Sequence, residues 1–233
     1  MDMERYGDYT EYEDDIPKSK SKVALTLKIL IALVCFSVIG VLVFRMFLFS
    51  YYPENMKTLY FNDKLTALYN EKGGDIDVKT QDLRAVYDDP DVAIFICDNL
   101  FVISEAEQLQ ITVRMNKSAL DDIEKELSLT GLDPAAEGFL SFKLACYSDE
   151  IGGEAYIDGV SVSIVAYEAK LMYHYYKLVC DGVKLGGINE PGWIRLDAFI
   201  AGSDEKFRGV YIYENNESYS VFKDYELSEE ERP

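Results

Sequence analysis

Histidine is nearly absent from this chain of 233 residues, which contains His174 alone. A zinc site built from several histidines is therefore excluded, and a Ser-His-Asp triad would depend on this one residue. We expect His174 to be a neutral, hydrogen-bonded core residue, because no nucleophile or carboxylate is predicted beside it. The sequence thus disfavours most hydrolase classes, and we predict that the protein is not an enzyme.

Positive charge is also scarce. The chain has 23 Lys and Arg residues against 42 Asp and Glu residues, a net charge of −19. Nucleic-acid binding normally requires a basic face, so no nucleic-acid partner is expected. With so many carboxylates, neighbouring pairs arise by chance, and none matches the spacing of a calcium loop. We therefore predict no metal and no cofactor.

The four cysteines include no Cys-x-x-Cys pair, which argues against a zinc or redox site. Cys35 lies within a long apolar run, whereas Cys97, Cys146 and Cys180 follow it and can close at most one internal disulfide. These three residues sit among apolar neighbours in predicted strands. Buried thiols are favoured over a single disulfide, which stays open as the alternative.

The chain also contains one long apolar run. Residues 29–44 carry no charge and are bounded by Lys28 and Arg45. About 20 apolar residues span the roughly 30 Å hydrocarbon layer of a bilayer, so we predict a transmembrane helix over residues 23–50. The run ends without a small-x-small cleavage site, which indicates an uncleaved anchor.

The basic residues predict the orientation of this helix. Lysines cluster before it, and the positive-inside rule then places the N-terminus in the cytoplasm and the C-terminal domain outside. We predict a single-pass protein of the plasma membrane. The residues expected at the membrane interface are Lys22, Lys28, Arg45, Tyr51 and Tyr52.

Four further segments are predicted around the anchor. Residues 1–22 form an acidic, then basic cytoplasmic tail, and residues 51–90 form a juxtamembrane stalk with a short helix. Residues 91–227 form an extracytoplasmic domain, and residues 228–233 form an acidic tail.

Alternating apolar residues define the fold class of that domain. In residues 108–115 every second residue is apolar, which is typical of a half-buried strand. The same pattern recurs up to residue 225, and only one helix, predicted at 116–127, interrupts it as a crossover. We predict a mainly β fold, an immunoglobulin-like antiparallel β-sandwich with one wet face on each sheet. The expected strands are 92–97, 100–104, 108–115, 139–147, 160–168, 171–181, 193–200, 208–214 and 219–225.

Three of these strand segments carry a family resemblance: Glu107–Asn116, Tyr176–Val183 and Gly209–Glu214. In them the chain resembles uncharacterised single-pass, membrane-anchored proteins of Gram-positive, gut-type bacteria. The resemblance covers about residues 55–225. It implies a bacterial plasma membrane, and it implies no activity, because that group has no assigned function.

The strand register predicts an aromatic outer face. If His174 and Tyr176 point inward, then Tyr173 and Tyr175 point outward, alongside Tyr211 and Tyr213 from another strand. Large exposed aromatic areas are rare on soluble surfaces and mark binding sites. Two alternatives stay open. The other sheet or the stalk covers this face, or a register slip of one residue exchanges the two faces.

We therefore expect a tethered interaction module that binds another envelope or surface protein through Tyr173, Tyr175, Tyr211 and Tyr213. The alternative is a tethered module for a small ligand or glycan, because tyrosine rings also stack on sugar faces. A hydrolase that uses paired carboxylates is the third and least favoured hypothesis.

Overall fold

The computed structural model divides the chain into two compact units, residues 1–47 and 48–233. The predicted cytoplasmic tail, except Lys22, and Tyr51 lie outside the described residues. The structure describes residues 22–50, 52–83, 95–148, 152–170, 172–185, 193–200, 202–214 and 222–233.

A single long helix, α1 (Lys22–Ser50), makes up the described part of the first unit. Its segment Leu25–Arg45 has a mean hydropathy of 2.8 over a membrane-spanning window. The large apolar side chains from Leu25 to Phe47 are exposed on every side of the helix. By length and composition this helix is able to cross a bilayer, and it coincides with the predicted transmembrane segment.

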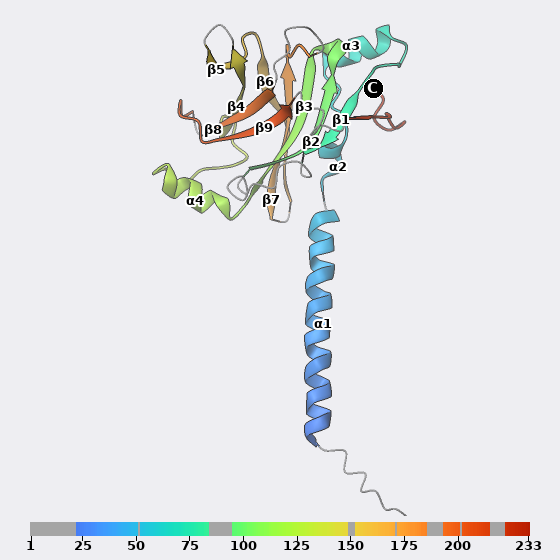
Figure 1. Ribbon diagram of the computed structural model, residues 1–233, viewed down its shortest axis with the longest axis vertical. Helices are drawn as coiled ribbons and strands as arrows, with labels where there is room; N and C mark the ends of the chain where they lie inside the picture. Colours follow the sequence, from blue (N-terminus) through green and yellow to red (C-terminus); the bar gives the residue numbers. More distant parts are fainter. Residues whose placement is uncertain are drawn as a thin grey trace, which may run out of the picture. The chain divides into compact units, whose positions relative to one another are not determined.

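Two antiparallel sheets form the second unit (Figure 1). The six-stranded sheet has the order β10-β1-β2-β3-β7-β6, and the four-stranded sheet has the order β5-β4-β8-β9. The prediction of a mainly β, antiparallel domain is confirmed. The strands are β1 (Lys79–Asp82), β2 (Phe95–Ile103), β3 (Gln108–Asn116), β4 (Leu140–Ser148), β5 (Gly153–Tyr156), β6 (Ser161–Lys170), β7 (Tyr173–Asp181), β8 (Trp193–Ile200), β9 (Arg208–Glu214) and β10 (Lys223–Asp224).

Both sheets contribute their inward side chains to one apolar core. The alternation in β3 and β7 points every second residue at this core, as the sequence predicts. The helix α4 (Ala119–Glu126), on the crossover from β3 to β4, adds Ala119 and Ile123 to it. The main core residues of the strands are Leu109, Ile111, Val113, Phe142, Leu144, Tyr176, Leu178, Leu196, Ala198, Val210 and Ile212.

The segment predicted as a stalk packs onto the six-stranded sheet. It contains α2 (Glu54–Lys57) and α3 (Asp63–Glu71), and it contributes β1 to the sheet. Asn62 caps α3 by accepting a hydrogen bond from the Leu65 amide at 2.9 Å. A second apolar cluster then joins the segment to the outer face of the sheet. It consists of Leu59, Leu65, Ile76, Val78, Phe101, Ile103 and Ala106.

The expectation of a wet outer face is wrong for this sheet, because polar side chains on it bond to the covering segment. Gln110 exchanges two hydrogen bonds with the backbone of Tyr60, at 2.8 and 2.7 Å. The Thr112 hydroxyl donates to the Met56 carbonyl at 2.7 Å. Eight of the nine residues of β3 are buried, because one side of the strand faces the core and the covering segment lies over the other side. The alternation of polar residues correctly predicts which side chains point away from the core. Here these side chains contact the covering segment instead of water.

The described part of the predicted acidic C-terminal tail also packs onto the domain. A Glu231 carboxylate oxygen accepts hydrogen bonds from the Leu59 amide, at 3.2 Å, and from the Tyr225 hydroxyl. Its other oxygen accepts from Ser228 at 2.8 Å. These contacts fix the chain after β10 beside the covering segment.

Candidate binding face

The structure does not bring the four predicted binding tyrosines together. Tyr173 and Tyr175 lie on β7 in the six-stranded sheet, whereas Tyr211 and Tyr213 lie on β9 in the four-stranded sheet. No common aromatic face can therefore form from all four. Each pair has to be considered on its own sheet.

Tyr175 points outward, as the register predicts, and is nevertheless only 2% exposed. The ring of Tyr52 packs edge-on against it, with centroids 5.0 Å apart. Tyr173 is half-buried and holds the Arg114 guanidinium 4.7 Å from its ring centroid. Tyr175 is thus covered by the chain after α1, which corresponds to the alternative left open by the sequence, that the stalk covers this face, and it offers no exposed surface. Tyr52 is likewise packed against the sheet, and burial raises its pKa.

Tyr213 is also turned away from the outer face. A β-bulge between β8 and β9 pairs Tyr213 with the core residue Ile194 instead of with an outward residue. Its ring packs against the core and lies near Phe222. Only Tyr211, at 36% exposure, remains as an exposed outward tyrosine among the four.

The outer face of the four-stranded sheet holds a larger aromatic group around Tyr211. The pairing places Tyr156, Ala145, Arg195 and Tyr211 in one row across all four strands. Tyr147 and Trp193 lie on the same side of the sheet, two residues along β4 and β8. Tyr147 and Tyr156 are 49% and 46% exposed. We call Tyr147, Tyr156, Trp193, Arg195 and Tyr211 the aromatic face.

A buried ion pair lies at the centre of the aromatic face. The Arg195 guanidinium donates to both carboxylate oxygens of Asp197, from Nε at 2.6 Å and from Nη2 at 3.0 Å, and from Nη1 to Glu154 at 2.6 Å. The hydrogen bonds with Asp197 are the largest cause of the raised pKa of Arg195. A bidentate pair of this kind fixes the guanidinium plane. Arg195 therefore acts as a rigid platform under the aromatic side chains.

The aromatic rings are arranged around this platform. The Arg195 guanidinium carbon lies 5.9 Å from the Trp193 ring centroid and 5.8 Å from that of Tyr211. The two rings meet edge-on with centroids 5.2 Å apart. Gly209 makes this possible, since a Cβ there would lie 2.6 Å from Asp197 Oδ1 and 3.0 Å from Arg195 Cδ. Because Gly209 has no side chain, this position of β9 leaves room for the ion pair between Arg195 and Asp197.

Two lysines give the face positive charge in an acidic protein. Lys143 Nζ lies 5.2 Å from the ring centroid of Tyr156 and 5.0 Å from that of Phe199. Lys206 Nζ lies 3.9 Å from Asp197 Oδ2. A hollow of about 230 Å³ opens between these groups, lined by Ala145, Glu154, Ala155, Tyr156, Arg195 and Lys206. Besides Arg195, the face thus offers rigid rings, two lysine ammonium groups and the half-exposed carboxylate of Glu154.

Groups that could carry covalent chemistry lie elsewhere. All four cysteines are free thiols, and Cys97 and Cys180 are buried as expected, while Cys146 is half-buried. Burial raises the pKa of Cys180 to about 12 and also raises that of Cys97, so both are poor nucleophiles.

His174 is half-buried on the inward side of β7, and its Nδ1 hydrogen-bonds the Tyr167 hydroxyl at 2.8 Å. Burial lowers its pKa, which favours the neutral ring. Among the described residues, no three metal-ligating side chains come together.

Sequence reasoning missed most of the aromatic face. The alternation in β8 does place Arg195 and Asp197 outward, and Trp193 shares their phase, so this part of the signal is readable. Tyr156 lies in β5, a four-residue strand with no visible alternation. Its proximity to Tyr211 depends on the strand order, which no local pattern specifies.

Comparisons with protein-family models, with curated proteins and with solved structures found no match to this chain.

Proposed function

We propose that this protein is a membrane-anchored interaction module that binds a protein partner through its aromatic face. In this proposal α1 is a single-pass anchor in the plasma membrane, the N-terminus is cytoplasmic, and the two-sheet domain lies outside. The resemblance to anchored proteins of Gram-positive bacteria supports a bacterial envelope as its location. The module has no catalytic role of its own.

One observation carries the proposal. Over β2, β3 and β7 the outer face of the six-stranded sheet is covered by the chain's own segments, whereas three tyrosines on the outer face of the four-stranded sheet are more than one-third exposed. They surround an ordered Arg195–Asp197 pair. Tyr, Trp and Arg are the residues enriched at the energetic centres of protein interfaces. Their rigid rings lose little side-chain entropy on binding.

The proposed fold within this module is an immunoglobulin-like sandwich in the broad sense of two packed antiparallel sheets. Its strand order differs in one respect from the immunoglobulin order. Here β1, β2 and β3 are neighbours in one sheet, whereas the third immunoglobulin strand belongs to the opposite sheet. The proposed kinship is therefore one of architecture.

Affinity purification of the full chain from intact, mildly cross-linked cells tests the proposed function. We expect one protein in stoichiometric amount with the unchanged chain, and at least a tenfold loss with the double variant Tyr156→Ala/Tyr211→Ala. Tyr60→Ala is the matched control, because Tyr60 is a 38% exposed tyrosine on the covering segment. Equal capture by all three chains would contradict the proposal. If no protein is captured, and the unchanged chain binds cell-wall glycan fragments while the double variant does not, the glycan-binding alternative replaces the proposal.

A further inference from the structure

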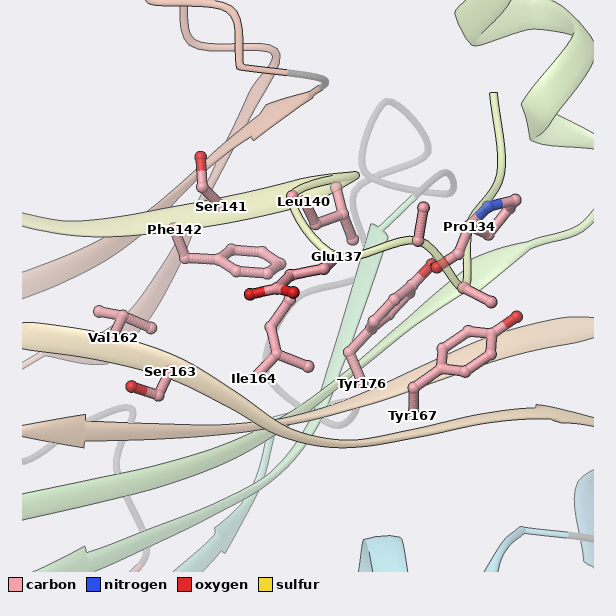
Figure 2. Close-up of a pocket in the computed structure, with 13 residues that line it drawn as sticks. Pro134, Glu137, Leu140, Ser141, Phe142, Val162, Ser163, Ile164, Tyr167 and Tyr176 are labelled. Atoms are coloured by element: carbon pink, nitrogen blue, oxygen red, sulfur yellow. The ribbon is translucent and has the colours of Figure 1, made fainter. Parts of the chain in front are cut away.

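A second concave site lies between the two sheets, away from the aromatic face. A cavity of about 570 Å³ opens between β4 and β6, and the loop at 134–138 borders it (Figure 2). Small-molecule sites typically enclose about 300–1,000 Å³. The cavity is therefore large enough for a small organic ligand.

The core is open at this cavity. The pairing of β6 with β7 sets Val162 opposite Cys180 and Ile164 opposite Leu178, so both β6 side chains point toward the core. Ile164 is nevertheless 39% exposed. Figure 2 shows Phe142 from β4 and Ile164 from β6 pointing toward one another across the cavity. Covering this exposed apolar surface with an apolar group of a ligand would remove it from water, which favours binding.

Hydrogen bonds hold the bordering loop in place. The Tyr176 hydroxyl donates to the Pro134 carbonyl at 3.1 Å. Within the loop, the Ala136 amide donates to the Asp133 carbonyl at 3.0 Å, and the Phe139 amide donates to the Ala136 carbonyl at 3.1 Å. The loop is thus ordered before any ligand arrives, which lowers the entropic cost of binding.

This loop directs the exposed side chain of Glu137 into the cavity, whose lining is partly polar. In Figure 2 the Glu137 side chain enters between Phe142 and Ile164. Within the described part of the chain, no basic side chain lies at ion-pair distance from the Glu137 carboxylate. The rings of Tyr167 and Tyr176 also line the cavity, and aromatic faces attract cations. The chain's net charge of −19 adds a general attraction for positive ligands.

We propose that this cavity binds a small organic cation, with an apolar body against Phe142, Val162 and Ile164 and an ammonium group at Glu137. The carboxylate supplies charge complementarity, and the three apolar side chains supply contact area. This site is separate from the aromatic face, so its test is independent of the proposed partner binding.

The test is a titration of the full-length chain in phosphatidylcholine nanodiscs, observed through isotope-labelled isoleucine methyl groups. Three probes share one apolar body: 4-phenylbutylamine, 4-phenylbutanol and 4-phenylbutyrate. The amine should shift the Ile164 methyl signal saturably and bind at least about fivefold more tightly than the alcohol, and the butyrate should bind most weakly. Because the signal belongs to the protein, partitioning of a probe into lipid does not mimic binding.

Two variants extend this test. Glu137→Gln should lower the affinity for the amine to that for the alcohol, and Glu229→Gln, an exposed control on the C-terminal segment, should leave it unchanged. An Ile164 signal that does not move with the amine overturns the proposal, as does equal affinity for amine and alcohol. Both of these outcomes are measured on the unchanged chain, so they stand even if a variant misfolds.

Discussion

Lys177 illustrates how a single residue departs from its expected surroundings. The alternation in β7 points it outward, where a lysine normally meets water, yet it is fully buried. Its Nζ donates to the Thr58 carbonyl at 3.0 Å and lies 4.5 Å from the Phe101 ring centroid. Burial lowers its pKa to about 7. No local pattern predicts this, because the covering residue Thr58 is 119 positions away in sequence.

The buried lysine makes stability depend on pH. Its pKa of about 7 in the folded chain is below the unfolded value of about 10.4, so the folded state binds this proton less well. The lysine therefore costs increasing stability as the pH falls from about 10.4 to 7, and a constant amount below that. Lys177→Met should remove this cost, which reaches at most about 5 kcal/mol at low pH.

Denaturation midpoints from pH 6 to pH 10 check this prediction. The midpoint of Lys177→Met should exceed that of the unchanged chain most at pH 6, and the gap should narrow toward pH 10. Lys184→Met serves as the control, since the Lys184 side chain is 81% exposed. A gap that stays constant across this pH range would show that Lys177 titrates as an ordinary lysine.

At the scale of elements, the sequence predicts the bounds of the long strands better than it predicts the short strands and the pairing between strands. The alternation predicts β3, β4, β6, β7, β8 and β9 close to their observed bounds. Two expected strands, 92–97 and 100–104, have all their described residues except Ser104 in the single strand β2, which has an irregular register between Cys97 and Leu100. The short strands β1 and β5 show no alternation and were missed. The bulge that turns Tyr213 inward is also invisible locally, because it is defined by the partner strand.

Gly209 on β9 tests the order of the aromatic face. In Gly209→Ala the new Cβ would meet the Asp197 carboxylate and the Arg195 side chain, so the ion pair must shift. We expect a loss of about 1–3 kcal/mol in unfolding free energy. The emission of Trp193, the chain's single tryptophan, should change as well, since its ring lies beside Arg195. Gly153→Ala is the control, because a Cβ there meets nothing within 4 Å. Unchanged emission in Gly209→Ala would contradict the tight packing of this pair.

Gln110 on β3 tests the attachment of the covering segment. Gln110→Ala leaves the Tyr60 amide and carbonyl without their side-chain partner, at a cost of about 1–3 kcal/mol. The Tyr60 amide should exchange its hydrogen at least about tenfold faster in the variant. The Leu65 amide, which donates a hydrogen bond to Asn62 Oδ1, is the internal reference, and its exchange rate should change less. Equal protection of the Tyr60 amide in both chains would show that Gln110 does not hold the segment.

At the scale of the whole molecule, sequence reasoning predicts the division into an apolar helix and a β domain. The helix can be predicted from the length and composition of its apolar run, and the β domain can be predicted from the alternation of apolar and polar residues. Which sheet face is covered could not be predicted, because it depends on where residues 52–83 pack. The proposed binding residues were therefore only partly predicted: Tyr211 is exposed and Tyr175 is covered, whereas the exposed Tyr147 and Tyr156 and the half-buried Trp193 complete the aromatic face.

The proposed membrane topology gives a prediction for the intact cell. In a Cys146→Ser background, a cysteine introduced at Glu230 should react with a membrane-impermeant thiol reagent, and one introduced at Asp8 should not. The lysines before α1 and the exposed position of Glu230 on the domain are the physical reasons. Labelling at position 8 with protection at position 230 would reverse the orientation.

The central claim is that a protein partner docks on the aromatic face, and site-specific photo-crosslinking tests it most directly. The photoreactive phenylalanine analogue p-benzoylphenylalanine would replace Tyr211, Tyr156 or, as the control, Tyr60 in the full-length chain in cells. We predict one discrete adduct of the same mass shift from positions 211 and 156, and none from position 60. Absence of an adduct at positions 211 and 156, or an equal adduct at position 60, would contradict the account.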